Sequence, residues 1–385
     1  MRSDPTSAGP AGRQRLFAAV LLAVVAAVLL ACAGRGLDPA APPPPRTSTD
    51  AGVDALMARY QGEVPGAALM VIRDGEAVVR RGYGLAELET GRAVTPATNF
   101  RLASISKQFT AAAVLLLAED RRLDLDDPVR RWLPTLPAAT DTVTIRHLLT
   151  HTSGLVDYEE AMPADLDPAD LSDQLRDADV LTILERQDRT YFVPGTGYRY
   201  SNSGYALLAL VVERASGVDY PEFLRQRIFA PLGMDATLAY VREGPAVPER
   251  AYGYSRTDSG WVRTDQSLTS AVLGDGGIYS SIDDLARWDA ALYDDRLLSD
   301  ASRRLAFAAT TPTDDPDIAY GFGWRITGDS LWHSGESIGF RNVLVRFPQR
   351  RLTVVLLSNR NDPEPYATAL RVAALFGAEA TGGGR

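Results

Sequence analysis

Hydrophobic and polar positions alternate most regularly near the two ends of the chain. Residues 66–72 and 77–83 are apolar segments on either side of Asp74-Gly75, a pair typical of tight turns, which predicts a β-hairpin. Four late segments have similar patterns and are predicted strands: residues 321–327, 331–334, 340–347 and 352–357. We expect all of them to form one antiparallel sheet that draws strands from both ends of the chain.

Between these ends the apolar positions have helical spacing. The clearest helices are predicted over residues 104–119 and 204–214. Further helices are predicted over residues 53–60 and 363–376 and from Ser281 onward. The region from about 105 to 250 has few alternating segments, which indicates an all-helical insertion. The predicted fold class is therefore α+β, an antiparallel sheet flanked by helices.

The chain begins with features of an export segment. Three arginines precede an unbroken apolar run over residues 16–31, which is shorter than the roughly 20 residues of a membrane span and typical of a signal-peptide core. The run ends in Leu29-Leu-Ala-Cys32, which resembles the lipobox of bacterial lipoproteins. That resemblance implies removal of residues 1–31, lipidation of Cys32 and a membrane-anchored, extracytoplasmic protein. The alternative is an uncleaved anchor helix, which also leaves the domain outside the cytoplasm.

Proline content and composition define the remaining parts. Residues 32–50 are proline-rich and are expected to form a semi-extended linker. The folded domain is then predicted over residues 51–378, followed by a flexible tail at 379–385. With 45% hydrophobic and 23% charged residues, the chain has the composition of a globular protein with a sizeable core.

Charge and residue counts exclude several classes of function. The net charge of −9 argues against nucleic acid as the main partner, because phosphate binding needs a basic face. The one cysteine excludes internal disulfides and cysteine-based zinc sites. Only three histidines are present, which leaves little room for metal chemistry. We therefore expect neither a metal nor a cofactor.

Lys107 is the only lysine among 40 basic residues. Arginine does not release its proton in a protein, whereas a desolvated lysine can act as a base. Ser104 lies three residues earlier, and residues i and i+3 share one face of a helix. Free N–H groups of the first helical turn would also favour a serine oxyanion there. The pair suggests a nucleophile and its base; the alternative is a serine helix cap followed by a solvated lysine.

Two further segments carry candidate chemistry. In the first, Tyr200 can relay a proton beside a lysine, and Asn202 can hold Lys107 or a substrate amide. Taken alone, this segment is better explained as a hydrogen-bonding turn before a helix. The second covers residues 332–336, where a strand would direct His333 to one side and Gly335 would permit close approach of a ligand to the backbone. The N–H of Glu336 would then join that of Ser104 in an oxyanion hole.

Together these segments resemble the three ordered motifs of penicillin-recognising serine enzymes. The Tyr-x-Asn form is similar to the branch with class C β-lactamases, D-alanyl-D-alanine carboxypeptidases, D-aminopeptidases and esterases. The resemblance covers roughly residues 51–378, and segments 147–155 and 274–281 also look like recurrent parts of that branch. It implies a sheet with flanking helices and a helical insert, and it assigns these roles: Ser104 as acylated nucleophile, Lys107 as base, Tyr200 as proton shuttle, Asn202 as substrate or lysine contact, and His333, Ser334, Gly335 and Glu336 as the strand that lines the site.

One departure from the family pattern affects the expected substrate. His333 stands where most β-lactamases have lysine, so less fixed positive charge is available for the carboxylate of a β-lactam or peptide. Arg341 is a candidate to supply it. We therefore expect a peptidase, amidase or esterase that acts on a small-molecule or peptide substrate. The alternatives are a β-lactamase, or a catalytically inactive lipoprotein that binds the cell wall.

Two other motifs suggest different chemistry. Residues 335–339 match the G-x-S-x-G nucleophile elbow, with Ser337 as nucleophile. That elbow needs a strand–turn–helix context and a later histidine, and no histidine follows His333. His147 and His151 have the i, i+4 spacing of two metal ligands on a helix, but the glutamate that would accompany them is absent. We expect a structural role for both histidines.

Overall fold

The computed structural model describes residues 48–164, 166–167 and 171–378, together with Met1. The predicted signal peptide after Met1, Cys32, the linker up to residue 47 and the tail lie outside these residues, so their assignments stay predictions. Residues 48–50, predicted as linker, instead belong to a helix. Residues from Thr49 onward cluster into one compact unit. Within the described residues, no helix is long and apolar enough to cross a membrane.

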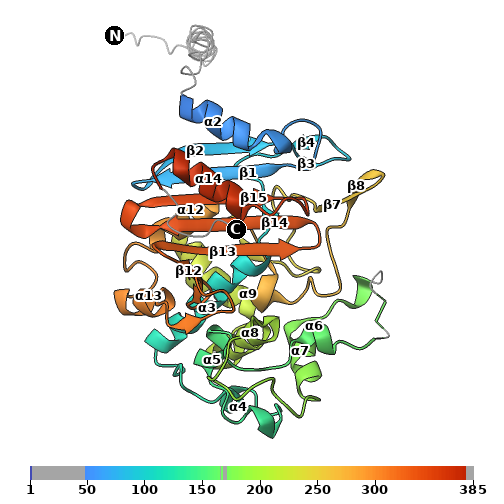
Figure 1. The fold of residues 1–385 in the computed structure, drawn as a ribbon, viewed down its shortest axis with the longest axis vertical. Coiled ribbons are helices and arrows are strands. Elements are labelled where there is room, and N and C mark those ends of the chain that lie inside the picture. The colour runs from blue at the N-terminus through green and yellow to red at the C-terminus, as the bar shows by residue number, and fades with distance from the viewer. Residues whose placement is uncertain (2–47, 165, 168–170, 379–385) are drawn as a thin grey trace. The chain divides into compact units, whose positions relative to one another are not determined.

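An eight-stranded antiparallel sheet forms the upper half of the domain in Figure 1, in the order β10-β11-β12-β13-β14-β15-β1-β2. The strands are β1 (Ala67–Arg73), β2 (Glu76–Tyr83), β10 (Thr311–Pro312), β11 (Ala319–Tyr320), β12 (Arg325–Thr327), β13 (Ser330–Ser337), β14 (Phe340–Phe347) and β15 (Leu352–Ser358). Strand β1 pairs with both β2 and β15. The prediction that both ends of the chain share one sheet is therefore confirmed.

Two predicted strands differ from the observed ones by three residues or more at one end. Residues 321–324 form a bend between β11 and β12 and are not part of a strand. The bend brings Gly323 against the main chain of the nucleophile helix: its φ is +78°, and a Cβ there would lie 2.8 Å from the Lys107 carbonyl oxygen. Strand β13 continues three residues beyond the predicted end at Ser334 because Gly335, Glu336 and Ser337 still pair with β14.

Helices cover both faces of the sheet and fill the lower half of the domain in Figure 1. They are α2 (Ser48–Leu56), α3 (Lys107–Glu119), α4 (Val129–Trp132), α5 (Ile145–Leu149), α6 (Tyr158–Ala161), α7 (Asp177–Leu184), α8 (Asn202–Ser216), α9 (Tyr220–Leu224), α10 (Ala230–Leu232), α11 (Leu273–Gly276), α12 (Ile282–Ala291), α13 (Asp300–Ala306) and α14 (Tyr366–Leu375). Helices α2 and α14 share one apolar cluster with one face of the sheet. The larger cluster joins the opposite face to α3, α8 and α12.

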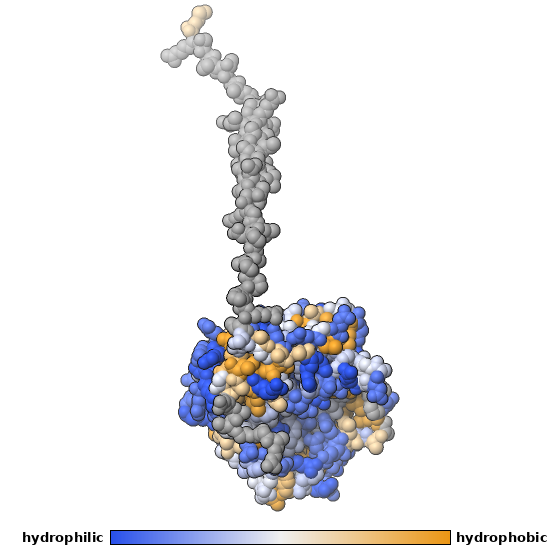
Figure 2. All heavy atoms as spheres, turned by 45° about the horizontal axis from the view of Figure 1, so that its top comes forward, coloured by the Kyte–Doolittle hydropathy of each residue, from blue (hydrophilic) through white to orange (hydrophobic). Residues whose placement is uncertain are grey.

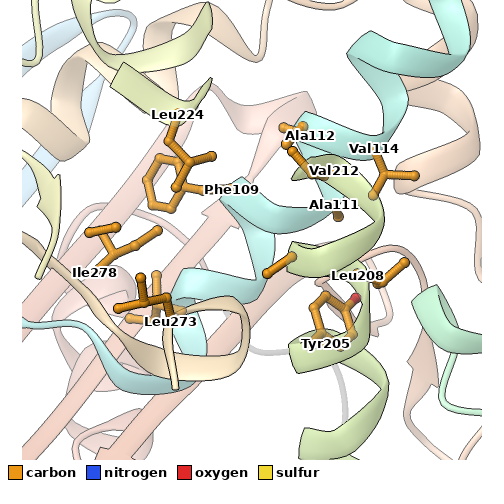
Figure 3. Close-up of a cluster of buried hydrophobic side chains, with 14 of the residues drawn as sticks. Phe109, Ala111, Ala112, Val114, Tyr205, Leu208, Val212, Leu224, Leu273 and Ile278 are labelled. Atoms are coloured by element: carbon orange, nitrogen blue, oxygen red, sulfur yellow. The ribbon is translucent and has the colours of Figure 1, made fainter. Parts of the chain in front are cut away.

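Helices α3 and α8 form the centre of the larger cluster. Figure 3 shows Ala111 and Ala112 of α3 opposite Val212 of α8, where the small side chains allow the two helices to approach closely. Phe109 extends to the other side and its ring lies 4.5 Å from that of Trp288. This packing fixes the amino end of α3 relative to the amino end of α8. Both ends carry residues that the sequence assigned to the site.

The insertion is not entirely helical, which corrects the prediction for residues 105–250. Strand β6 (Leu238–Ala239) lies within it and joins β9 (Ile278–Ser280) and β5 (Phe100–Arg101) in a three-stranded sheet. Two small pairs add β3 (Leu85–Glu87) with β4 (Arg92–Ala93), and β7 (Tyr254–Thr257) with β8 (Gly260–Arg263). Strands of two to four residues are too short to show a period in the sequence, so none of these was predicted.

The face shown in Figure 2 is largely hydrophilic, with apolar areas that are separated by charged and polar residues. Large exposed hydrophobic residues such as Val193, Leu305 and Ile338 are far apart in the sequence and belong to different elements. Isolated apolar residues of this kind are normal on a protein surface.

Candidate active site

Ser104 lies in a 3-10 turn formed by Ala103–Ser106, directly before α3. The prediction placed it in the first turn of the α-helix, so it is one short turn earlier than expected. Ala103 has a φ of 51°, a left-handed conformation that an L-residue other than glycine rarely adopts. Backbone strain of this kind is concentrated at functional sites. The turn leaves Ser104 partly exposed while the residues on both sides are buried.

The amine of Lys107 is completely buried beside Ser104. Its Nζ lies 3.1 Å from Ser104 Oγ, 2.8 Å from Asn202 Oδ1 and 2.8 Å from the Asp275 carbonyl oxygen. The alternative of a solvated lysine is therefore wrong. The structure brings together the serine, the lysine and the asparagine that the sequence had assigned to one site.

These three contacts determine what a neutral amine can do. The Asn202 and Asp275 contacts are carbonyl oxygens, which only accept hydrogen bonds. A neutral Lys107 amine donates its two protons to them, and its lone pair is left for the third neighbour. That neighbour is the Ser104 hydroxyl, which is the only one of the three with a proton to donate. The geometry thus suits the transfer of the serine proton to Lys107.

The asparagine is held by its place at the start of α8. The Ser201 hydroxyl accepts a hydrogen bond from the Gly204 N–H at 3.3 Å and caps the helix. The Asn202 N–H donates to Asp157 Oδ2 at 2.9 Å. Its Nδ2 points to the Glu159 carboxylate at 3.5 Å, which leaves Oδ1 for Lys107. The amide orientation is therefore fixed from both sides.

Tyr200 lies over the lysine, as the sequence predicted. Its ring centroid is 5.0 Å from Lys107 Nζ and 5.5 Å from the Arg325 guanidinium. The ring also packs against His151, with 4.3 Å between ring centroids. The hydroxyl oxygen is buried and has no hydrogen-bond partner in the part of the chain that the structure describes. It is therefore available to a reacting group.

His333 is buried in β13 and is not directed at Ser104 by any hydrogen bond. Its Nδ1 donates to the Ser334 carbonyl oxygen at 2.6 Å, so that Nε2 accepts from the Tyr320 hydroxyl at 2.9 Å. Burial lowers the pKa of His333 well below its usual value, and the charge of Arg325 lowers it further. The histidine is neutral at pH 7. The positive charge near Tyr200 comes instead from Arg325, which the sequence analysis missed.

Gly335 serves a different purpose from the one predicted. A Cβ at this position would lie 1.9 Å from the carbonyl oxygen of Leu102, two residues before the nucleophile. The close neighbour is therefore the protein's own backbone, not a ligand, and the glycine allows β13 to press against the Ser104 turn. Arg341 is not free to bind a substrate: it donates to the carbonyl oxygens of Ser337 and Phe340 and lies 3.4 Å from the Glu336 carboxylate.

A cavity of about 60 Å³ opens beside Ser104. Its lining includes Ser104 and Glu336, the two residues proposed for the oxyanion hole, together with Asn202. Two acids line it as well, the buried Asp275 and the more exposed Glu159. Burial raises the pKa of Asp275 to about 7, against the opposing effect of Lys107. Burial and the nearby charge of Asp157 also raise the pKa of Glu159.

The two rival motifs lack the required setting. Ser337 is the last residue of β13 and is followed by a turn into β14, whereas a nucleophile elbow needs a helix at that point. His147 closes a capping box of α5, in which its Nδ1 accepts from the Thr144 N–H at 3.3 Å. Among the described residues, no cluster of three histidine, cysteine or acidic side chains could hold a metal ion.

The comparison with known families decides the identity of the fold. The model of the family described as Beta-lactamase matches residues 50–379. The chain belongs to the β-lactamase family. It is 36% identical over 334 residues to penicillin-binding protein 4* of Bacillus subtilis (strain 168), which covers 80% of this chain and 72% of that protein. It is 32% identical to a D-aminopeptidase of Gluconobacter oxydans (strain 621H), with 85% of this chain and 62% of that protein covered.

Solved structures of this family agree. A penicillin-binding protein homologue from Pyrococcus abyssi superposes with a TM-score of 0.74 at 27% identity, over 86% of this chain and 77% of that one. A D-amino acid amidase from Ochrobactrum anthropi SV3, complexed with D-phenylalanine, superposes with a TM-score of 0.73 at 25% identity, over 86% and 99%. The protein is thus a serine hydrolase with the β-lactamase fold, as the sequence resemblance implied.

Proposed function

We propose that the protein hydrolyses small amides or peptides through an acyl-enzyme formed on Ser104. The observation that supports this is the contact set of Lys107, in which two carbonyl acceptors leave the lone pair of a neutral amine for the Ser104 hydroxyl. Serine hydrolases need such a base because the hydroxyl is a weak nucleophile at neutral pH.

The reaction would proceed in two halves. Lys107 takes the proton as Ser104 Oγ attacks the substrate carbonyl carbon, and the N–H groups of Ser104 and Glu336 stabilise the oxyanion. The bond to the leaving amine then breaks, and Tyr200 passes it the proton it needs. Water enters, loses its proton to the same basic groups and attacks the acyl carbon. Ser104 recovers its proton as the acid product leaves.

An amide of an amino acid is the substrate class that the surroundings support. The Glu159 carboxylate faces the cavity next to Asn202, at a position where it can pair with a free amino group. Relatives of this chain are named D-aminopeptidase and D-amino acid amidase. We therefore propose a D-amino-acid amidase or aminopeptidase activity, with ester or β-lactam hydrolysis as the alternative outcomes of the test.

A serine-reactive fluorophosphonate probe tests the mechanism. Labelling of the wild-type protein and loss of the label in Ser104→Ala are expected, with Ser337→Ala as the matched control that still labels. A folded but unlabelled wild-type protein would indicate a catalytically inactive cell-wall-binding protein instead. The substrate is then tested by comparing turnover of D-alanine amide, L-alanine amide, a D-Ala-D-Ala peptide, a chromogenic cephalosporin and a short-chain ester.

We also propose that the protein is an extracytoplasmic lipoprotein anchored through Cys32. The support is the lipobox-like Leu29-Leu-Ala-Cys32 after a 16-residue apolar run, in a chain with no other cysteine. Metabolic labelling with an alkyne fatty acid, followed by detergent-phase partitioning, is expected to show a lipidated membrane protein. Cys32→Ser should lose the label and leave the membrane fraction. An unlabelled wild-type protein would overturn this assignment.

A further inference from the structure

Arg101 is a second buried cation next to the catalytic segment, and the mechanism above does not use it. It is only 3% exposed and lies on β5, where it pairs with Tyr279 of β9. On the opposite side, Asn342 Nδ2 donates to the Arg101 carbonyl oxygen at 2.8 Å. The backbone of Arg101 is therefore held from both sides, so its side chain starts from a fixed position three residues before Ser104.

The guanidinium of Arg101 has no ion-pair partner within the described chain, although its charge lowers the pKa of the nearby Asp275 carboxyl against the effect of burial. Its Nε and Nη1 are buried without a hydrogen-bond partner, and no ion pair involves it. Arg346 is equally buried and shows the contrast, because its Nε donates to the Asp289 carboxylate at 2.6 Å. A buried cation without a partner is unfavourable. The arrangement suggests that the partner arrives with a ligand.

Arg101 lines the same cavity of about 60 Å³ as Ser104. Ser337 lines it too, and its buried hydroxyl oxygen also lacks a partner among the described residues. The volume is about twice the share of one water molecule in the liquid, roughly 30 Å³, which is room for a group the size of a carboxylate. The cavity therefore combines a cation, a hydroxyl donor and space for a small anion.

The acids in the cavity have other partners. Glu336 is paired with Arg341, and Asp275 accepts a hydrogen bond from the Tyr158 hydroxyl at 3.0 Å. Because burial raises the pKa of Asp275 to about 7, this carboxyl group carries only part of a charge at neutral pH. Glu159, the third acid of the cavity, lies 3.5 Å from Asn202 Nδ2. Among the described residues, none of the three acids is within ion-pair distance of Arg101, and its charge acts on Asp275 from farther away.

We propose that Arg101, assisted by the Ser337 hydroxyl, binds a carboxylate carried by the substrate. The enzyme would then select amides or peptides with a negative charge close to the scissile bond. The guanidinium fork matches both oxygens of a carboxylate, and the hydroxyl supplies a third donor. This inference rests on the proposed function, because it places the anion in the cavity of the nucleophile.

Binding to the Ser104→Ala protein tests the inference without any turnover. The ligands are N-acetyl-D-alanine and its neutral amide, which have the same shape and differ in charge. Calorimetry is expected to show at least tenfold tighter binding of the acid, and Arg101→Gln in the same background should abolish the difference. Equal affinity for the two ligands in the parent protein would overturn the proposal.

Further variants separate this site from its neighbours and from a folding defect. Ser337→Ala removes one hydroxyl and is expected to weaken binding of the acid about threefold with unchanged thermal unfolding. Arg80→Gln, at an exposed ion pair with Asp283, is the matched control and should keep the full preference. If Arg341→Gln or Arg325→Gln abolishes the preference and Arg101→Gln does not, the anion binds elsewhere and the proposal is wrong.

Kinetics show which side of the scissile bond carries the charge. We compare phenyl butyrate with phenyl hydrogen glutarate, which has an acyl carboxylate, and with 3-carboxyphenyl butyrate, which has a leaving-group carboxylate. One charged ester should have the higher kcat/KM in the wild type and lose that advantage in Arg101→Gln. Charge-selective binding without turnover would refute the proposed function alone. Turnover without charge selectivity would refute the role of Arg101 alone.

Discussion

Lys107 and Arg101 lie six positions apart in one segment, and both side chains are almost completely buried. Every donor of the Lys107 amine has a partner within the protein at 3.1 Å or less. Two nitrogens of Arg101 have none among the described residues. Lys107 is positioned to react with Ser104. Arg101 is positioned to bind an anionic ligand.

The difference follows from the chemistry of the two side chains. A lysine amine can lose its proton. When two neighbouring carbonyl oxygens accept its remaining hydrogens, its lone pair points to the third neighbour. A guanidinium keeps its charge and can act only by binding. The sequence pointed to the lysine because it is the only one in the chain and lies three residues after a serine. It did not point to the arginine, whose significance lies in a missing partner.

The largest expected effect comes from Lys107→Arg, which keeps the charge and removes the base. We expect kcat/KM to fall by about three orders of magnitude, the scale of a lost general base. Stopped-flow measurement of acylation with the fluorophosphonate probe checks this. Ser104→Ala shows the lower limit of the assay, and thermal unfolding shows whether the larger side chain is tolerated. Acylation at the wild-type rate would disprove the role of Lys107.

Gly335→Ala should disturb both cations, because β13 presses on the segment between them. A Cβ placed 1.9 Å from the Leu102 carbonyl oxygen forces the backbone to move. We expect roughly a hundredfold loss of kcat/KM and a loss of about 2 kcal/mol in the free energy of unfolding, typical of overpacking. Chemical denaturation measures the second effect.

Gly276→Ala is the matched control for the stability measurement. A Cβ there would lie 3.6 Å from Ala103, an ordinary contact, so its free energy of unfolding should stay near that of the wild type. If Gly335→Ala is as stable and active as the wild type, the contact between β13 and the Ser104 turn is required neither for stability nor for activity.

Replacing each cation by methionine should change stability in opposite directions. Lys107→Met leaves the Asn202 and Asp275 carbonyl oxygens buried without a donor, which costs about 1–3 kcal/mol. Arg101→Met removes an unpartnered buried charge and should stabilise the fold by about 1 kcal/mol. Urea denaturation of both variants checks this. A destabilised Arg101→Met protein would show that the guanidinium has a structural partner.

A further prediction concerns Asp275 and pH. Burial raises its pKa in the folded protein to about 7 from the ordinary 3.8, so between these values the folded protein keeps a proton that the unfolded chain has lost. This contribution to stability is complete below about pH 4 and is lost as pH rises to 7, by at most about 1.4 kcal/mol per unit. Asp275→Asn should reduce that slope, as denaturation at pH 5, 6 and 7 would show. An unchanged slope would assign the effect to other groups.

The sequence predicted those parts of the fold that have a long period. Helices α3 and α8 and strands β1, β2, β14 and β15 extend over seven residues or more, so their apolar spacing is visible. Strands β5, β6 and β9 contain two or three residues and exist because they pair with one another. No local sequence pattern predicts strands this short, and Arg101 lies on one of these strands, β5.

In the site, too, the sequence predicted some residues and missed others. The structure brings Ser104, Lys107 and Asn202 within hydrogen-bonding distance and places Tyr200 beside them. The main-chain acceptor at Asp275 and the charge of Arg325 were missed, because any residue can offer a carbonyl and arginine is abundant here. Tertiary packing alone selects which carbonyl and which arginine matter.

Strand β1 belongs to the first part of the domain to be translated, yet its neighbour β15 is among the last. Until that late strand has left the ribosome, the early hairpin has one unpaired edge and β13 cannot be seated against the nucleophile turn. A chain released prematurely would therefore lack any partial activity. Hydrolysis is thus expected only from a chain that contains β15.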